Sequence, residues 1–393
     1  MNQNPIKIGV VGLGRAFTLM LGTFQLDPRI ELVGAADTSS VATSQFSNTF
    51  GLKAHEDVEK LCQQKDVELV YVASPHQHHA AHVQVALKMG KHVMVEKPMA
   101  ISLQECTDMI ECARRHDRHL IVGHSHSFDA PVRMAKEIID QGKYGKIKMI
   151  TAMNYTDFLY RPRRPEELIT RAGGGVIHSQ AAHHIDIIRL LAGGKVTQIQ
   201  AQTGQWDPQR PTEGAYSALL RFENNSFASV TYSGYGHFDS DIWMDNISEL
   251  GQRKSTYLYG EARKKINKIN PQEESELKAT KNQQNTIEEL AKNKLPDGNQ
   301  HFGPIIVSCE GADLQLTPNG IWIHSDEDQI FHKTPVNPIP RAEVIDELWD
   351  CLRLNKNGIH TGPWARATTE VCLGILEAAR TSQTFYPVMQ VGL

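Results

Sequence analysis

The first third of the chain alternates short apolar runs with stretches of helical spacing. The apolar runs, which are typical of buried strands, are residues 6–11, 30–36, 69–74, 92–95 and 119–122. Between them, residues 15–26, 78–89 and 102–116 place apolar positions three or four apart, as an amphipathic helix requires. Strands that alternate with helices predict a parallel sheet with right-handed crossovers. We therefore expect residues 1–125 to form one doubly wound α/β domain with a dinucleotide-binding (Rossmann) sheet.

The pattern changes after residue 125, where polar and apolar residues alternate along most of the predicted strands. Strands are expected at 146–157, 196–206, 216–222, 227–235, 305–308, 313–316 and 321–324, with hairpin turns at 223–226 and 318–320. Helices are expected at 131–141, 176–191, 343–354 and 366–382. Residues 126–393 should form a second α/β domain for substrate binding and oligomerisation, around a large, mostly antiparallel open sheet. Within it, residues 261–300 are rich in Lys, Glu, Asn and Gln, which predicts an exposed charged insertion.

Charge and cysteine content exclude several classes of protein. The 393 residues hold 41 Lys+Arg and 45 Asp+Glu, a net charge of −4, whereas nucleic-acid binding by phosphate neutralisation needs a basic excess. No apolar run approaches the roughly 20 residues that span a bilayer. The polar start argues against a secretory signal, and the six cysteines form no CxxC pair. We expect a cytoplasmic protein with reduced thiols, and no nucleic-acid or membrane partner.

A cofactor motif follows the first predicted strand. Gly12-Leu13-Gly14 allows a tight turn that approaches a pyrophosphate closely, and Arg15 and Ala16 then open a helix whose N–H groups favour phosphate. The third position of the fingerprint is Phe17 rather than Gly or Ala. Asp37 ends the next strand, where a carboxylate binds the ribose hydroxyls of NAD and repels a 2′-phosphate. NAD is favoured over NADP because Thr38 and its neighbour offer no arginine, although Arg15 could still reach a phosphate.

Two further motifs resemble those of the glucose–fructose oxidoreductase / inositol dehydrogenase (Gfo/Idh/MocA) family. They are Ser74-Pro75-His76-Gln77-His78-His79 and Gly90 to Pro98, the second ending in Glu96-Lys97-Pro98. The resemblance implies that Ser74, Pro75, His76, His79 and Glu96 lie along the cofactor and that Lys97 is a catalytic lysine. The residues support this independently, because Lys97 follows a strand at the ligand edge of a parallel sheet. Pro98 fixes the backbone there, through either a trans or a cis bond.

The second half matches the same family from Gly173 to Asp186. The family's histidine falls on His183, which the resemblance makes the acid/base on the substrate oxygen, and the family's aspartate falls on Ser179. Positions 179 and 183 are one helical turn apart, so both can face one pocket. Asp186 is expected to orient the helix. His124 and His126 end a strand at the edge of the predicted cleft and are expected to line the substrate pocket.

Ser179 removes a negative charge, and the segment from Asn154 to Pro165 adds positive ones. Arg161, Arg163 and Arg164, which follow Tyr160 and are stiffened by two prolines, make a candidate carboxylate clamp. These features resemble the family's branch of phthalate and chlorobenzoate cis-dihydrodiol dehydrogenases. That resemblance implies oxidation of a carboxylated cyclic diol to a catechol with NAD. The alternative for the arginines is a set of interface salt bridges.

Other functions remain open at this point. A sugar or inositol dehydrogenase is the alternative within the family, and a non-catalytic dinucleotide-binding regulator is the alternative outside enzymes. His78 and His82 have zinc-chelating spacing, but nothing nearby completes a ligand set, so no metal is expected. The open sheet suggests burial against a second copy, which predicts a homodimer or homotetramer.

Overall fold

A computed structural model describes residues 4–255, 260–270, 272–278 and 296–393. The chain forms two compact units. The first contains the described residues up to His124 together with Ile339–Thr369. The second contains Glu370–Leu393 and the described residues of Ser125–Lys278 and Leu295–Pro338. Both are α/β, which confirms the predicted fold class. No helix in the described ranges is long and apolar enough to cross a membrane.

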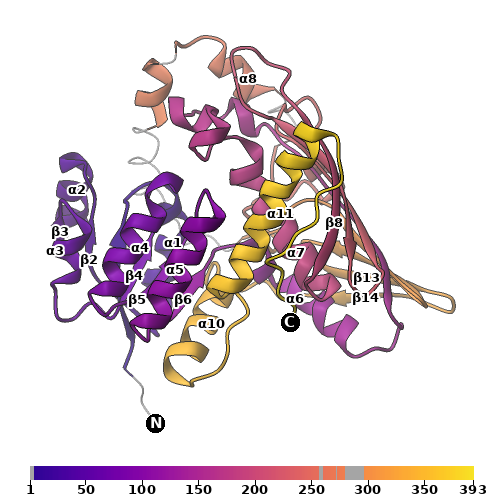
Figure 1. Cartoon of the computed structure of the whole chain (residues 1–393), viewed down its shortest axis with the longest axis horizontal. Helices are drawn as coiled ribbons and strands as arrows, with labels where there is room; N and C mark the ends of the chain where they lie inside the picture. Colours follow the sequence, from indigo (N-terminus) through magenta and orange to yellow (C-terminus); the bar gives the residue numbers. More distant parts are fainter. Residues whose placement is uncertain (1–3, 256–259, 271, 279–295) are drawn as a thin grey trace. The chain divides into compact units, whose positions relative to one another are not determined.

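The first unit is built on a six-stranded parallel sheet in the order β3-β2-β1-β4-β5-β6 (Figure 1). Its strands are β1 (Ile6–Val11), β2 (Ile30–Ala36), β3 (Lys53–His55), β4 (Leu69–Val72), β5 (His92–Val95) and β6 (Leu120–Val122). The strand order reverses between β1 and β4, and ligands of such sheets bind outside the carboxyl ends at this switch point.

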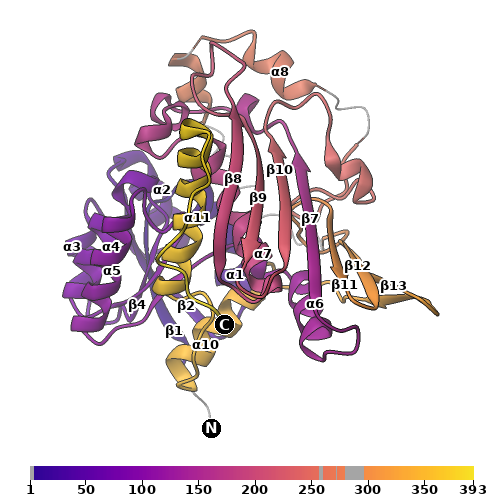
Figure 2. The same ribbon diagram turned by 45° about the vertical axis from the view of Figure 1, so that its right-hand side comes forward.

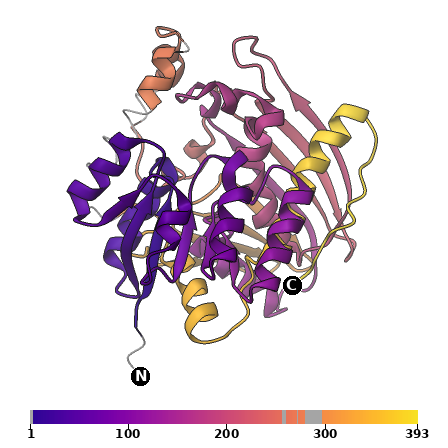
Figure 3. The ribbon, with the colours of Figure 1, turned by 60° about the vertical axis from the view of Figure 1, so that its left-hand side comes forward.

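Helices flank this sheet, as the indigo and violet ribbons of Figure 3 show. They are α1 (Arg15–Leu26), α2 (Ser40–Phe50), α3 (Val58–Cys62), α4 (His79–Lys88) and α5 (Leu103–Arg115). The sequence pattern predicted α1, α4 and α5 but missed α2, β3 and α3. Helix α2 is rich in Ser, Thr and Asn and buries only Phe46, so it has no apolar stripe to detect. Strand β3 has three residues, too few to show a period.

The division of the chain differs from the linear one expected from the sequence. The break after residue 124 lies close to the expected boundary, but Ile339–Thr369 packs with the first unit rather than the second. Arg353, at the end of α10 (Ala342–Arg353), binds both carboxylate oxygens of Glu68, at 2.5 and 2.7 Å. Thr23 of α1 donates to the carbonyl oxygen of Pro340. These contacts join positions about three hundred residues apart, so local sequence patterns carry no sign of them.

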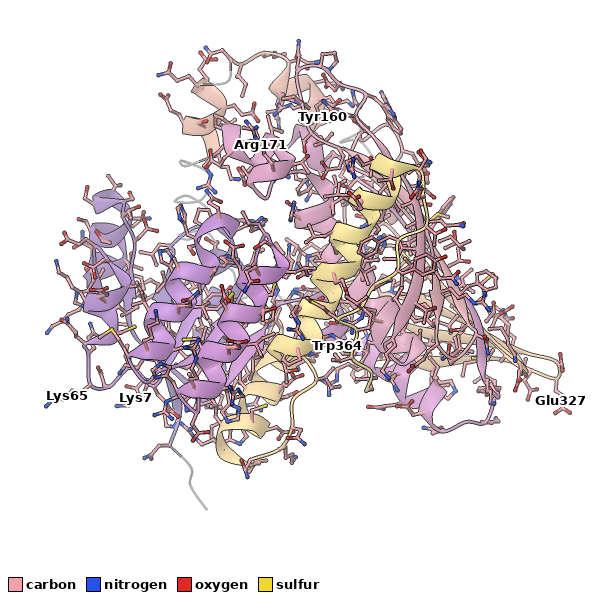
Figure 4. The ribbon with its side chains drawn as sticks, in the orientation of Figure 1. Lys7, Lys65, Tyr160, Arg171, Glu327 and Trp364 are labelled. Carbon is pink, nitrogen blue, oxygen red and sulfur yellow. The ribbon has the colours of Figure 1, made fainter. Side chains whose placement is uncertain are left out.

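The second unit is built on an eight-stranded sheet in the order β14-β13-β12-β11-β7-β10-β9-β8 (Figure 2). Its strands are β7 (Ile147–Tyr155), β8 (Val196–Gly204), β9 (Ala215–Phe222), β10 (Phe227–Ser233), β11 (Ile305–Cys309), β12 (Ala312–Thr317), β13 (Gly320–Ser325) and β14 (Gln329–Lys333). Only the β7–β10 pair is parallel, which confirms a mostly antiparallel sheet. Strand β14 was not predicted, and the hairpin that it forms with β13 carries Glu327 at its tip (Figure 4).

The two faces of this sheet differ in burial. Alternate residues of β10, such as Val230 and Tyr232, are fully buried, on the face against which α7 (Ala182–Ala192) packs. Helix α6 (Ala130–Asp140) packs near β12 and β13, and α11 (Gly362–Thr381) brings Gly374 against Ile199 of β8. The opposite face carries apolar side chains that stay 37–46% exposed: Leu219, Phe227, Ile306 and Phe331.

The charged stretch at 261–300 is less exposed than expected where it is described. Helix α8 (Glu261–Ile266) is followed by a helical segment at 272–278. The Arg263 guanidinium lies 3.9 Å from the centre of the Tyr160 ring, and Glu274 forms a buried ion pair with Arg210 at 2.7 Å. Two of its charged side chains therefore make contacts with other elements of the second unit. Residues 271 and 279–295, which belong to the same predicted insertion, lie outside the described residues.

Candidate active site

The glycine turn after β1 leaves room for a ligand on one side only. Gly12 has φ +95°, and a Cβ there would lie 2.7 Å from the backbone nitrogen of Ser74, so only glycine fits. A Cβ on Gly14 would meet nothing within 4 Å. Gly14 is also the N-cap of α1, and no side chain caps it. The first N–H groups of α1, where Arg15 and Ala16 lie, therefore adjoin open space that suits a phosphate.

Asp37 lies beside this turn, as predicted from its place after β2. One carboxylate oxygen accepts from the backbone nitrogen of Leu13 and the other from that of Ser39, both at 2.8 Å. Each oxygen keeps a lone pair for a ribose hydroxyl. Thr38 lies between the two hydrogen-bonded positions. The open Gly14 side, the uncapped helix end and the held carboxylate together fit a dinucleotide.

Phe17 explains the departure from the glycine fingerprint. Its ring is buried and lies 6.1 and 6.5 Å from the rings of Phe46 and Phe50 on α2. An aromatic cluster therefore packs α1 against α2 here. In the usual fingerprint a small residue at this position allows close helix–strand packing, whereas in this chain Phe17 packs against α2.

His79 is fully buried and joins two parts of the ligand edge. One ring nitrogen lies 2.9 Å from the Pro98 carbonyl oxygen and the other lies 2.8 Å from that of Ser74. Burial lowers the pKa of His79 to about 4, so the ring is neutral at pH 7. His79, which we expected to lie along the cofactor, thus holds the segments of Ser74 and Pro98 together. His76 lies nearer the surface, with its ring 5.7 Å from that of His79, and Pro75 precedes it.

The Glu96-Lys97-Pro98 turn is held from several sides within the first unit. The Tyr71 hydroxyl donates to Glu96 at 2.6 Å, and the backbone nitrogen of His124 donates to the same oxygen at 3.4 Å. Burial raises the pKa of Glu96, and the positive charge of Arg341 offsets only part of that effect. The Lys97–Pro98 bond is cis, one of the two options left open by the sequence. Lys97 therefore extends from a fixed backbone at the carboxyl end of β5.

In the second unit, the glycine turn packs directly on the arginine segment, residues 161–168. A Cβ on Gly174 would lie 2.5 Å from the Glu167 carbonyl oxygen, so the two backbones touch. Glu213 accepts from the backbone nitrogens of Val176 and Ile177 through its carbonyl and carboxylate oxygens. These contacts fix the start of the helix that carries Ser179 and His183.

That helix is not the regular one expected from the sequence. Ile177–Ala181 forms a π-helix, and α7 begins only at Ala182. The wider turn changes the expected geometry, because four residues no longer make a full turn between Ser179 and His183. Such π turns occur mostly at functional sites.

His183 contacts a second histidine. Its Nδ1 accepts from the backbone nitrogen of His126 at 3.3 Å, and the two rings lie 4.6 Å apart. A backbone N–H can only donate, so the neutral His183 ring carries its proton on Nε2. Nδ1 of His126 lies 2.6 Å from a carboxylate oxygen of Asp129. The structure thus brings the two predicted histidines of the second unit together.

Asp186, which we expected to orient the helix, is hydrogen-bonded to another segment of the second unit. The Ser127 hydroxyl donates to its carboxylate at 2.5 Å, and both residues are buried. This bond ties the segment of His126 to α7, three residues after His183. The contact between the two histidines therefore has a support that does not depend on their own side chains.

The three predicted arginines lie close in sequence but have different partners. Arg161 binds Asp157 at 2.8 Å and lies 3.6 Å from Glu249. Arg164 lies 3.1 Å from Glu166 and 3.6 Å from Glu167. The Arg163 guanidinium lies 3.6 Å from the centre of the Phe158 ring and donates to the Phe158 carbonyl oxygen.

Tyr160 lines a hollow in the second unit. Its hydroxyl donates to Asp207 at 2.8 Å, and its ring is labelled beside the α8 region in Figure 4. The hollow has a volume of about 500 Å³ and is lined by aromatic side chains that include Tyr155 and Trp206. Tyr155 alternates with Asn154 on β7, and Asn154 is the buried one. Tyr155, which lines the hollow together with Tyr160, thus lies on the sheet face away from α7.

Two residues of the second unit, Phe302 and Glu249, were not identified from the sequence. The Phe302 ring lies 4.8 Å from that of His183 and 4.7 Å from that of His184. Glu249 accepts from the Asn154 side chain at 3.1 Å. Although burial raises the pKa of Glu249, Arg161 and His126 lower it overall. Neither Phe302 nor Glu249 lies in a periodic segment, so no sequence signal marked them.

Comparison with known proteins places the chain in a family. Residues 6–124 match the model of an oxidoreductase family with an NAD-binding Rossmann fold, and residues 132–260 match the Gfo/Idh/MocA C-terminal domain. The chain is 46% identical over 380 residues, 95% of each protein, to 1-carboxy-3-chloro-3,4-dihydroxycyclohexa-1,5-diene dehydrogenase of Comamonas testosteroni. The chain therefore belongs to the Gfo/Idh/MocA family of NAD-binding oxidoreductases, which confirms the resemblance.

More distant relatives share the architecture. Myo-inositol 2-dehydrogenase of Thermotoga maritima is 27% identical over 65% of this chain and 82% of its own. A crystal structure from Bordetella bronchiseptica, described as a dehydrogenase, matches with a TM-score of 0.92 and 36% identity, covering 98% of this chain and all of the other. The WlbA dehydrogenase of Bordetella pertussis, solved with NADH and UDP-GlcNAcA, has the same fold at a TM-score of 0.69 and 19% identity, over 98% and 99% of the chains.

Proposed function

We propose that this enzyme oxidises a carboxylated cyclohexadiene cis-diol to a catechol with NAD as hydride acceptor. The observation that carries the proposal is the packing of the arginine segment on the turn that begins the His183 helix. A basic segment fixed there gives an anionic group on the substrate a partner near the reacting hydroxyl. Ser179, where the family has an aspartate, avoids repelling that anion. The name of the Comamonas relative gives a substrate of this class, a carboxylated dihydroxycyclohexadiene.

The reaction removes a hydride from a carbinol carbon and a proton from its oxygen. When bound, NAD supplies the hydride-accepting carbon of the nicotinamide. The resulting hydroxy-dienone then tautomerises: the neighbouring carbinol carbon loses its proton, the new carbonyl oxygen gains one, and the ring becomes a catechol. The overall products are the catechol, NADH and one proton. Because the ring becomes aromatic, the protein has mainly to orient the diol and to accept the hydroxyl proton.

The hydrogen bond at His183 suggests how the two catalytic residues divide this work. With Nδ1 accepting from His126, the neutral ring has a donor at Nε2. A donor binds and orients the hydroxyl oxygen but cannot take its proton. We therefore assign the general base to Lys97, acting as a neutral amine, and the orienting donor to His183. This modifies the acid/base role that the family resemblance implies for His183.

The cofactor preference rests on Asp37. Its carboxylate, held at the end of β2, favours ribose hydroxyls and disfavours a 2′-phosphate, so we propose NAD rather than NADP. The six cysteines, all within the described ranges, are free thiols, which favours a reducing compartment, and we propose the cytoplasm.

The uncovered sheet face supports a homo-oligomer. Four apolar side chains, Leu219, Phe227, Ile306 and Phe331, stay 37–46% exposed on it. We propose that a second copy covers this face, in a dimer or tetramer. Sedimentation velocity should give at least twice the 44.0 kDa chain mass. Leu219→Lys should shift the distribution toward monomer, while Val41→Lys, at a 59% exposed apolar position on α2, should not. A monomeric wild type would refute the proposal.

The cofactor site can be tested through the open side of Gly14. Gly14→Ala should weaken NAD binding about tenfold or more, because the new Cβ takes space that we assign to the pyrophosphate. The melting temperature should not change, since the Cβ meets no protein atom within 4 Å. Gly22→Ala on the same helix is the control and should leave NAD binding unchanged. Asp37→Ala should reduce the difference between the dissociation constants of NAD and NADP. Tighter binding of NADP than of NAD by the wild type would contradict the role of Asp37.

The substrate class can be tested by NADH absorbance with four compounds. These are a carboxylated cyclohexadiene cis-diol, the same diol without its carboxylate, myo-inositol and glucose. We expect kcat/KM for the carboxylated diol to exceed the others by about tenfold or more, the scale of one charged contact. Comparable or better activity on inositol or glucose would favour the sugar or inositol dehydrogenase alternative.

The same assay separates the roles of Lys97 and His183. Lys97→Ala and His183→Ala should each lower kcat by about a hundredfold or more. His183→Asn keeps a donor and should retain about a tenth of wild-type kcat, whereas it could not replace a base. Equal inactivity of the Asn and Ala variants would show that His183 itself takes the proton.

A further inference from the structure

The three arginines after Tyr160 differ in one respect that matters for binding an anion. Arg161 has Asp157 and Glu249 within 4 Å, and Arg164 has Glu166 and Glu167. Although burial lowers the pKa of Arg161, Glu249 and Asp157 raise it overall. Two of the three guanidinium groups therefore already face carboxylates of the protein.

Arg163 has no carboxylate within ion-pair distance in the part of the chain that the structure describes. Its Nη2 donates to the Phe158 carbonyl oxygen at 2.7 Å, and its Nε is buried without a hydrogen-bond partner. Burial lowers the pKa of Arg163 to about 10, and the charge of Glu167 offsets only part of that effect. A partly buried cation of this kind is stabilised by any anion that reaches it.

The geometry of the group limits how an anion could bind. The flat side of the guanidinium lies on the Phe158 ring, 3.6 Å from its centre, and the Nε edge is closed. The terminal edge remains, where Nη1 has two hydrogens and Nη2 has one beyond its bond to Phe158. Two parallel hydrogen bonds from these nitrogens match the two oxygens of one carboxylate.

A short chain of contacts links Arg163 to the His183 helix. The backbone nitrogen of Phe158 donates to the Thr156 hydroxyl at 3.1 Å, which lies 2.8 Å from the Tyr232 hydroxyl. Tyr232 in turn donates to the Gln180 side chain at 3.3 Å. Gln180 belongs to the π-helix and directly follows Ser179. The ring under Arg163 is thus fixed to the same turn that positions Ser179.

We propose that Arg163 alone among the three arginines binds the carboxylate of the substrate, end-on through Nη1 and Nη2, and so determines specificity for carboxylated diols. This rests on the proposed function for the identity of the substrate. Arg161 and Arg164 are already paired with carboxylates of the protein. The prediction separates residues that the sequence alone could not tell apart.

The test measures equilibrium binding by calorimetry to the full-length enzyme saturated with NADH. The probes are 3,4-dihydroxybenzoate and catechol, which differ only in the carboxylate. Arg163→Met should raise the dissociation constant of 3,4-dihydroxybenzoate about thirtyfold or more and change that of catechol by less than about threefold. Arg163→Lys, which keeps the charge but not the fork, should fall between the wild type and Met.

Two further variants complete the comparison. Arg164→Met should change the binding of 3,4-dihydroxybenzoate by less than about threefold. Arg171→Met is the matched control, because Arg171 is exposed and lies in the same region of the second unit (Figure 4). A smaller effect of Arg163→Met than of Arg164→Met would overturn the inference, as would wild-type enzyme that binds both probes equally. If Arg163→Met does not fold, wild-type binding by Arg163→Lys overturns it instead.

Different outcomes would contradict the proposed function and the role of Arg163. If carboxylated diols are not oxidised but 3,4-dihydroxybenzoate binds in an Arg163-dependent way, the anion site stands and the substrate assignment is wrong. If the diols are oxidised with kcat/KM unaffected by Arg163→Met, the function stands and the role of Arg163 is wrong.

Discussion

The helix of His183 begins where two stretches of backbone touch, and the rest of the proposed chemistry depends on that contact. A Cβ on Gly174 would lie 2.5 Å from the Glu167 carbonyl oxygen. A larger residue at position 174 would therefore push the glycine turn and the arginine segment apart. Glu213 binds the first amides of the helix. The bond between Ser127 and Asp186 then holds His126 against the same helix. Orientation of the histidine and placement of the arginines thus have one common support.

Burial decides which groups around this helix carry charge. The pKa of His178 is lowered to about 4 and that of His184 to about 3, in both cases mainly by burial, so both rings are neutral at pH 7. Glu249, in contrast, stays ionised because Arg161 and His126 outweigh its burial. The arginine segment and its carboxylate partners thus supply fixed charges in the second unit. An anionic substrate meets a preformed pattern of charge rather than one that it has to induce.

Sequence patterns predicted the parts of the molecule that depend on neighbours along the chain. Gly12 and Asp37 are each tied to the end of a buried strand, so spacing alone was sufficient to bring them together. The partners of His183 are different, because the amide that fixes its tautomer belongs to His126, 57 positions earlier. Phe302 reaches the same cluster from beyond the charged insertion. The transfer of Ile339–Thr369 to the first unit depends on similarly distant contacts, such as Arg353 with Glu68.

The arginines illustrate the same limit on a smaller scale. Composition identified a basic segment, but the three guanidinium groups could be ranked only once their carboxylate partners were known. Asp157 and Glu166 are close in sequence, yet Glu249 comes from far along the chain. Helix α2 and strand β3 were not predicted for a simpler reason. Helix α2 buries one phenylalanine and β3 has only three residues, so neither shows a hydrophobic periodicity.

The most direct test of the account follows the hydride itself. A carboxylated cyclohexadiene cis-diol, deuterated at both carbinol carbons, is oxidised by the enzyme, and the nicotinamide is then examined by NMR. The account predicts one deuterium at C4 of the NADH for each carboxylated catechol formed. Deuterium-free NADH, or deuterated NADH without an aromatic product, would contradict it.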